Sequence, residues 1–143
     1  MSTLTSLNVV FMISVTGVYT TPTQLQGFAA DGGFEQESAD RVETVLGADG
    51  KMSYGLIARQ YAQTVTLQPD SASNIIFENW DLAQTTLGDV ITANASIVYP
   101  GLSRKYTLSN GVMKGFKPLP DLGKLLKPRT FALIWNTITP AAM

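Results

Sequence analysis

The sequence contains neither cysteine nor histidine among its 143 residues. Together these absences exclude thiol nucleophiles, zinc sites built from Cys and His, serine–histidine triads and imidazole acid–base chemistry. They also exclude a disulfide framework. A chain of this length buries roughly two-thirds of the surface that its unfolded form exposes, so it needs no covalent or metal staple. We therefore expect one domain over residues 1–143, with no cofactor and no metal.

Long hydrophobic runs are also missing. The longest apolar stretch, residues 9–18, is interrupted by Ser14, Thr16 and Gly17. It is far shorter than the ~20 residues that a membrane helix needs. No basic residue precedes it, so it lacks the charged start of a signal peptide. The sequence predicts a soluble protein that is made without a targeting signal and has no membrane partner.

Charge is scarce and unevenly distributed. Charged residues make up 15% of the chain, and the formal net charge is −1. Residues 1–100 hold ten acidic and three basic residues, whereas residues 101–143 hold one acidic and seven basic residues. Two interpretations stay open. Either the two halves interleave in one fold and the asymmetry disappears, or the subunit has an acidic and a basic face suited to head-to-tail contacts.

The first forty residues predict one strand followed by a long loop. Apolar side chains recur at every second position between residues 7 and 19, which is typical of a strand. Residues 20–38 contain Pro22 and three glycines but little periodicity, which indicates a loop. Loops of this length inside compact domains are often functional. We therefore interpret residues 20–38 as an assembly or binding arm.

The middle of the chain predicts a hairpin. Residues 41–46 and 52–58 are β-compatible and flank Asp49-Gly50, a dipeptide that favours a tight turn because glycine adopts positive φ. Residues 60–68 alternate as a third strand, which would complete a three-stranded meander.

A single amphipathic helix is expected after this strand. Ile76, Trp80, Ala83 and Leu87 are spaced by four, three and four residues, and Gly88 marks the end of the helix. The carboxylates of this helix are expected to be ordinary solvated surface charges.

The last third of the chain again predicts strands. Candidate strands lie within residues 89–99, 105–108, 112–116 and 130–138. Asn110-Gly111 predicts a second hairpin, and residues 117–128 predict an exposed basic loop. The fold class is therefore mainly β, a β-sandwich or barrel of about eight strands with one flanking helix.

Catalytic chemistry finds little support in the residues present. The carboxylate pairs Glu35 with Glu37 and Glu43 with Asp49 have the residue types that cleave glycosidic bonds, but their spacing does not require that role. The sequence shows no phosphate-binding, dinucleotide or calcium-loop motif. The acidic pI of about 5.2 also argues against a dedicated nucleic-acid binder. We predict that the protein is not an enzyme.

Four segments, taken in order, resemble the tail tube protein family of contractile-tailed bacteriophages. They are residues 43–50, residues 64–68, the helix that begins at Asn74, and residues 88–91. Each piece alone is common in β proteins, and the order and spacing carry the resemblance. It covers most of residues 5–139.

The resemblance implies a ring-forming, tail-tube-like fold. Hexameric rings would stack into a hollow tube inside a contractile sheath, and genomic DNA would pass through the lumen without specific binding. The implied partners are further copies of the chain and the sheath, baseplate and tail-terminator proteins. The implied location is the virion tail, after synthesis in the cytoplasm of the host bacterium.

The same resemblance suggests site residues. Asp40 and Glu43 are candidate lumen residues, because a channel for DNA should repel phosphates. Candidates for contacts between subunits lie in the long loop: Gln24, Leu25, Gly27, Phe28 and Phe34.

An alternative from another class is a monomeric β-sandwich module that recognises carbohydrate or protein. Such a module would place exposed Trp or Tyr side chains in a shallow groove. It would also remain monomeric in solution.

Overall fold

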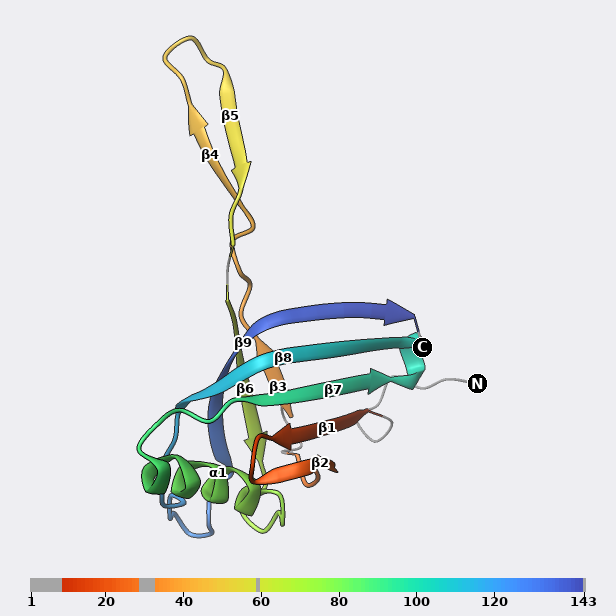
Figure 1. Cartoon of the computed structure of the whole chain (residues 1–143), viewed down its shortest axis with the longest axis vertical. Coiled ribbons are helices and arrows are strands. Elements are labelled where there is room, and N and C mark those ends of the chain that lie inside the picture. The colour runs from red at the N-terminus through yellow and green to blue at the C-terminus, as the bar shows by residue number, and fades with distance from the viewer. Residues whose placement is uncertain (1–8, 29–32, 59, 143) are drawn as a thin grey trace.

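The computed structural model describes residues 9–28, 33–58 and 60–142. Figure 1 shows a curled sheet with one helix at one end and a two-stranded hairpin projecting from the other. The strands are β1 (Val10–Val15), β2 (Tyr19–Gln24), β3 (Phe34–Gln36), β4 (Val42–Leu46), β5 (Met52–Leu56), β6 (Tyr61–Leu67), β7 (Ala93–Tyr99), β8 (Arg104–Gly115) and β9 (Arg129–Ala142). The helix α1 spans Asn74–Leu87, and a 3-10 turn, η2, spans Pro100–Leu102. The predicted mainly β fold with one helix is confirmed.

Seven strands form one antiparallel sheet in the order β2-β1-β7-β8-β9-β6-β3. The sheet curls strongly (Figure 1), and β9 runs through the curl, pairing with β6 through residues 129–135 and with β8 along most of its length. The curl brings β1 against β3, and the rings of Phe11 and Phe34 lie 5.4 Å apart at their centroids. A further bridge joins Phe28 to Leu67. The sheet thus folds back on itself around one core.

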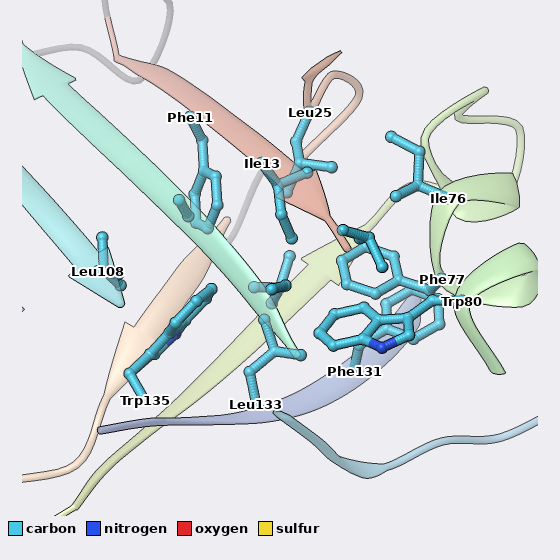
Figure 2. Close-up of a cluster of buried hydrophobic side chains, with 14 of the residues drawn as sticks. Phe11, Ile13, Leu25, Ile76, Phe77, Trp80, Leu108, Phe131, Leu133 and Trp135 are labelled. Atoms are coloured by element: carbon cyan, nitrogen blue, oxygen red, sulfur yellow. The ribbon is translucent and has the colours of Figure 1, made fainter. Parts of the chain in front are cut away.

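Large aromatic side chains fill that core. Trp80 from α1 and Trp135 from β9 are both fully buried. Figure 2 shows Trp80 beside Phe77 and Phe131, with Trp135 on the other side of Leu133. The rings of Phe77 and Phe131 stack at 4.2 Å between centroids. Each indole N–H is satisfied: Trp80 donates to the carbonyl of Ile91 at 2.8 Å, and Trp135 donates to the Gln63 side chain at 2.8 Å. Burial of each such side chain contributes roughly 3 kcal/mol.

The helix follows the predicted pattern. It begins at Asn74 and ends before Gly88, whose φ of 77° is the left-handed conformation that closes helices. Ile76 and Trp80 are buried against the sheet, as their spacing predicts, whereas Leu87 is exposed. No helix within the described ranges is long and apolar enough to cross a membrane.

The second predicted hairpin is wrong. Asn110 and Gly111 lie inside the continuous strand β8, at a bulge opposite Asn94. Asn110 has a φ of 52°, and its backbone N–H donates to the side chain of Asn94. A Cβ at Gly111 would stand 2.3 Å from the Trp135 ring. The glycine is therefore required for close packing of an indole, and not for a turn.

Two further expectations are corrected. The meander does not form, because β6 pairs with β9 and β3 and not with β5. The strand expected over residues 7–19 ends at a turn around Gly17, where φ is +75°. The next strand, β2, then occupies the start of the segment expected to be a loop. As a border strand with mostly exposed side chains, β2 shows no apolar alternation.

Candidate assembly surfaces

The hairpin of β4 and β5 forms a separate two-stranded sheet, as its Asp-Gly turn predicts. Gly50 has a φ of +85°, and the Asp49 carboxylate accepts a hydrogen bond from the backbone N–H of Lys51. At the base of the hairpin, Arg41 donates to the Tyr61 hydroxyl of β6 at 2.8 Å. The hairpin is thus closed at its tip and tied to the body at its root.

One face of this hairpin is apolar and exposed. Val42 lies opposite Leu56, and Leu46 lies opposite Met52, so these side chains share one face of the ribbon. With Tyr54 they form the apolar hairpin face, and its five residues are between 52% and 77% exposed. An isolated two-stranded hairpin is only marginally stable in water. This face therefore has the character of a contact surface whose partner lies outside the subunit.

Two of the unpaired strand borders in the described chain lie on opposite sides of one layer. Figure 1 shows β9, β8, β7, β1 and β2 side by side in one layer. The strand β2 forms one border of this layer. At the other border, β9 pairs with β6 only as far as Trp135, so residues 136–142 pair with β8 alone. Pro22 lies in β2 and Pro140 in the second half of β9, and proline, which has no backbone N–H to donate, limits indiscriminate strand pairing.

The helix end of the molecule carries an apolar groove. The groove has a volume of about 780 Å³ and is lined by α1, the turn after β1 and the segment before β7. Leu82, Leu87 and Val90 are exposed there. Its lining contains no basic residue, and Asp81 and Asp89 are its neighbours in the chain.

Arg129 anchors the neighbouring loop of residues 117–128. Its side chain is nearly buried, donates to Glu78 of α1 at 2.7 Å and donates to the carbonyl of Lys117 at 3.1 Å. The expectation that the helix carboxylates are simply solvated is therefore wrong for Glu78. This ion pair joins one residue of the acidic part of the sequence to one residue of the basic part.

The loop itself is held by internal hydrogen bonds. The backbone N–H of Lys127 donates to the carbonyl of Asp121 at 2.9 Å, and Lys117 pairs with the Asp121 carboxylate at 2.7 Å. A hydrogen bond from the Lys117 ammonium, together with its charge, lowers the pKa of Asp121. The same segment carries four leucines that are 50% to 82% exposed: Leu119, Leu122, Leu125 and Leu126. We call residues 117–128 the leucine–lysine loop.

The predicted lumen residues and contact residues lie in different environments. Asp40 and Glu43 are exposed on the hairpin arm, and Gln24 is exposed on the border strand β2. Leu25, in contrast, is 1% exposed and belongs to the core.

The remaining contact candidates also support the subunit's own packing. Phe28 and Phe34 pack on Phe11, with ring centroids 6.3 and 5.4 Å away. A Cβ at Gly27 would stand 2.6 Å from Ser71. These residues are therefore engaged inside the subunit, and the apolar hairpin face and the leucine–lysine loop present the larger exposed apolar surfaces. Sequence reasoning missed both, although the leucines between lysines in residues 117–128 were a visible signal.

The carboxylates considered for catalysis do not form a site. Glu35, Glu37, Glu43 and Asp49 are all exposed along the arm. The groove at the helix end and a second groove lined by Phe34, Tyr99 and Tyr106 contain no carboxylate. Within the described residues, no cluster of Asp and Glu is arranged to hold a metal ion.

Comparison with known proteins identifies the family. The family model of tail fiber protein gp32 matches residues 2–139. The chain belongs to this family. It is a structural tail protein, which confirms the prediction of a tail protein family and the prediction that the chain is not an enzyme. No curated protein matches the chain by sequence.

Solved structures show where the fold occurs. A chain of the anti-feeding prophage baseplate, in a six-fold symmetrised structure, matches with a TM-score of 0.60 at 15% identity and covers 99% of this chain and 98% of that chain. A chain of the anti-feeding prophage cap matches with a TM-score of 0.61 at 10% identity, over 100% and 93% of the two chains. A chain from the sheath–tube complex of an extracellular contractile injection system matches with a TM-score of 0.54 at 10% identity, over 93% and 88%. These likenesses show a shared fold.

Proposed function

We propose that this tail protein is a tube subunit whose copies join side by side into hexameric rings, and that these rings stack into a channel. The observation that carries this proposal is the pair of unpaired strand borders on opposite sides of one layer. Residues 136–142 of one copy would pair with β2 of the next. An exposed border is normally an aggregation hazard, but closure of a ring converts it into directed assembly.

Six-fold symmetry is supported by the comparison with the baseplate. That structure is described as six-fold symmetrised, and its matching chain shares the fold over nearly its full length. A contact between two different borders is heterologous, and such a contact closes into a ring when its rotation matches the number of copies. Sheath, baseplate and tail-terminator proteins are the partners that we propose along such a tube, within the tail of a phage particle.

The channel would carry genomic DNA without binding it specifically. Asp40 and Glu43 remain our candidates for its wall, and both are exposed. Glu43 shares its hairpin face with Val45, Ser53 and Gly55, on the side opposite the apolar hairpin face. DNA carries one negative charge per ~1.7 Å of its axis, so carboxylates at the wall keep it from adhering.

Truncation of one strand border tests the proposal. The buried side chains of β9 end at Trp135, so a variant that ends at Ile138 should keep its fold. We expect the full chain to form rings or tubes with a central hole in electron micrographs. The truncated variant should sediment as a monomer with an unchanged circular dichroism spectrum.

Two results would contradict the proposal. One is a full chain that stays monomeric at high concentration. The other is a truncated variant that forms rings as readily as the full chain. Ile75→Ser, an exposed substitution on α1 and outside both border strands, is the matched control and should leave ring formation intact.

A further inference from the structure

Exposed large apolar residues gather at two opposite ends of the molecule. All of those in the described chain except Leu102 lie either in the hairpin or at the end formed by α1 and residues 117–128. Figure 1 shows the hairpin at one end of the long axis and α1 at the other. Two different apolar surfaces at opposite ends favour head-to-tail contacts between copies.

We propose that the leucine–lysine loop is the docking site for the hairpin of a second copy in the next ring. This inference rests on the proposed function, because it assigns the contact between stacked rings. The apolar hairpin face would cover the four exposed leucines of the loop. Neither surface is covered within its own subunit.

Charge selects the loop over the groove at the same end. The arm of residues 35–57 holds five carboxylates and two basic residues, and the leucine–lysine loop holds three lysines and one aspartate. The groove offers no basic residue in its lining and has Asp81 and Asp89 beside it. Opposite charges steer association and like charges disfavour it over a Debye length of about 10 Å. The acidic arm therefore matches the loop and is repelled by the groove.

The leucine–lysine loop is also preorganised for binding. Arg129 holds its start through the carbonyl of Lys117, and the backbone N–H of Lys127 donates to Asp121 across it. The N–H of Gly123 donates to the carbonyl of Leu125 at 3.0 Å. Because the frame is already ordered, docking loses little conformational entropy there.

A single contact of this kind is weak. Stable interfaces bury about 800 Å² on each partner and involve roughly 20–30 residues a side. The hairpin offers five apolar side chains and the loop offers four. Stacking would therefore depend on several contacts made at once between two rings.

Charge reversal tests the pairing. Rings of Lys124→Glu/Lys127→Glu should form normally but fail to stack into tubes in electron micrographs. Mixing these rings with rings of Glu35→Lys/Glu37→Lys should restore stacking, because the opposite charges are then exchanged. All four side chains are exposed, so the folded subunit should be unaffected. Tubes formed by the loop variant alone as readily as by the wild type would overturn the inference.

Disulfide trapping tests the geometry, since the chain has no cysteine of its own. Mixed Tyr54→Cys and Leu122→Cys proteins should cross-link under mild oxidation, and Tyr54→Cys with Leu82→Cys in the groove is the matched control. A strong cross-link to position 82 and none to position 122 would overturn the inference. If the wild type forms tubes without a 54–122 cross-link, only this inference fails. If the wild type forms neither rings nor tubes, the proposed function fails as well.

Discussion

The body and the hairpin of this protein are built from similar strands but differ completely in burial. In the body, Trp135 and Phe131 of the curled sheet and Trp80 of α1 are fully buried. In the hairpin, every residue of β4 and β5 is exposed, including five large apolar side chains on one face. This difference shows that an apolar strand pattern indicates a surface that must be covered. The covering layer can come from the same chain or from another molecule.

The largest expected effect is on the body. Trp135→Ala should lower the free energy of unfolding by about 3–5 kcal/mol, because it leaves a cavity and removes the hydrogen-bond partner of Gln63. Tyr54→Ala in the hairpin should change it by less than about 0.5 kcal/mol. Urea unfolding of subunits kept monomeric measures both values. Similar decreases in the free energy of unfolding for the two variants would contradict the proposed difference between the body and the hairpin.

The bulge in β8 should show the next largest effect. Gly111→Ala should cost about 1–3 kcal/mol, because the new Cβ would overlap the Trp135 ring. Combined with Trp135→Leu, the same change should cost clearly less, since the ring is then absent. A double-mutant cycle in urea provides the measurement. An unchanged cost in the double variant would contradict the close-packing role of Gly111.

Ion pairs provide a third, smaller contrast. Glu78→Gln weakens the partner of the nearly buried Arg129 and should cost about 1–2 kcal/mol. The matched exposed pair of Lys117 with Asp121 should matter less, and Asp121→Asn should cost under about 0.5 kcal/mol. Thermal unfolding of the two variants separates them. Equal shifts in melting temperature would mean that Arg129 does not anchor the loop.

The smallest effect should appear in alkali. Burial, and to a lesser extent the charge of Tyr106, raise the pKa of Tyr99, so the fold favours its neutral hydroxyl. This contribution is complete below the ordinary tyrosine pKa of about 10 and is lost as the pH rises through the folded pKa. Tyr99→Phe should therefore flatten the fall in stability above pH ~10. An equally steep fall in this variant would assign the alkaline loss to other groups.

Several elements could be predicted because their sequence patterns are local. The helix follows from the spacing of Ile76 and Trp80, and the first hairpin follows from Asp49-Gly50. In both cases the side chains that decide the element lie within a few residues of one another. The predicted β class follows from the same local alternation.

Other features depend on distant residues and could not be read locally. Asn110-Gly111 has the composition of a turn, and only the position of Trp135 shows why glycine is needed in a continuous strand. The border strand β2 lacks alternation because it has no apolar side to cover. The exposure of the hairpin was equally hidden, since its alternation is the same as that of a strand packed on a core.

The long strand β9 has a mechanical consequence. Its first half lies in the core through Phe131 and Trp135, and its second half forms a free border of the sheet. Tension applied to that border runs along the strand, so the hydrogen bonds to β6 and β8 resist it together in shear. A force perpendicular to the strand would instead break these hydrogen bonds one after another. A subunit tied to its neighbours through β9 would thus pass a load along the strand into the buried core around Trp135.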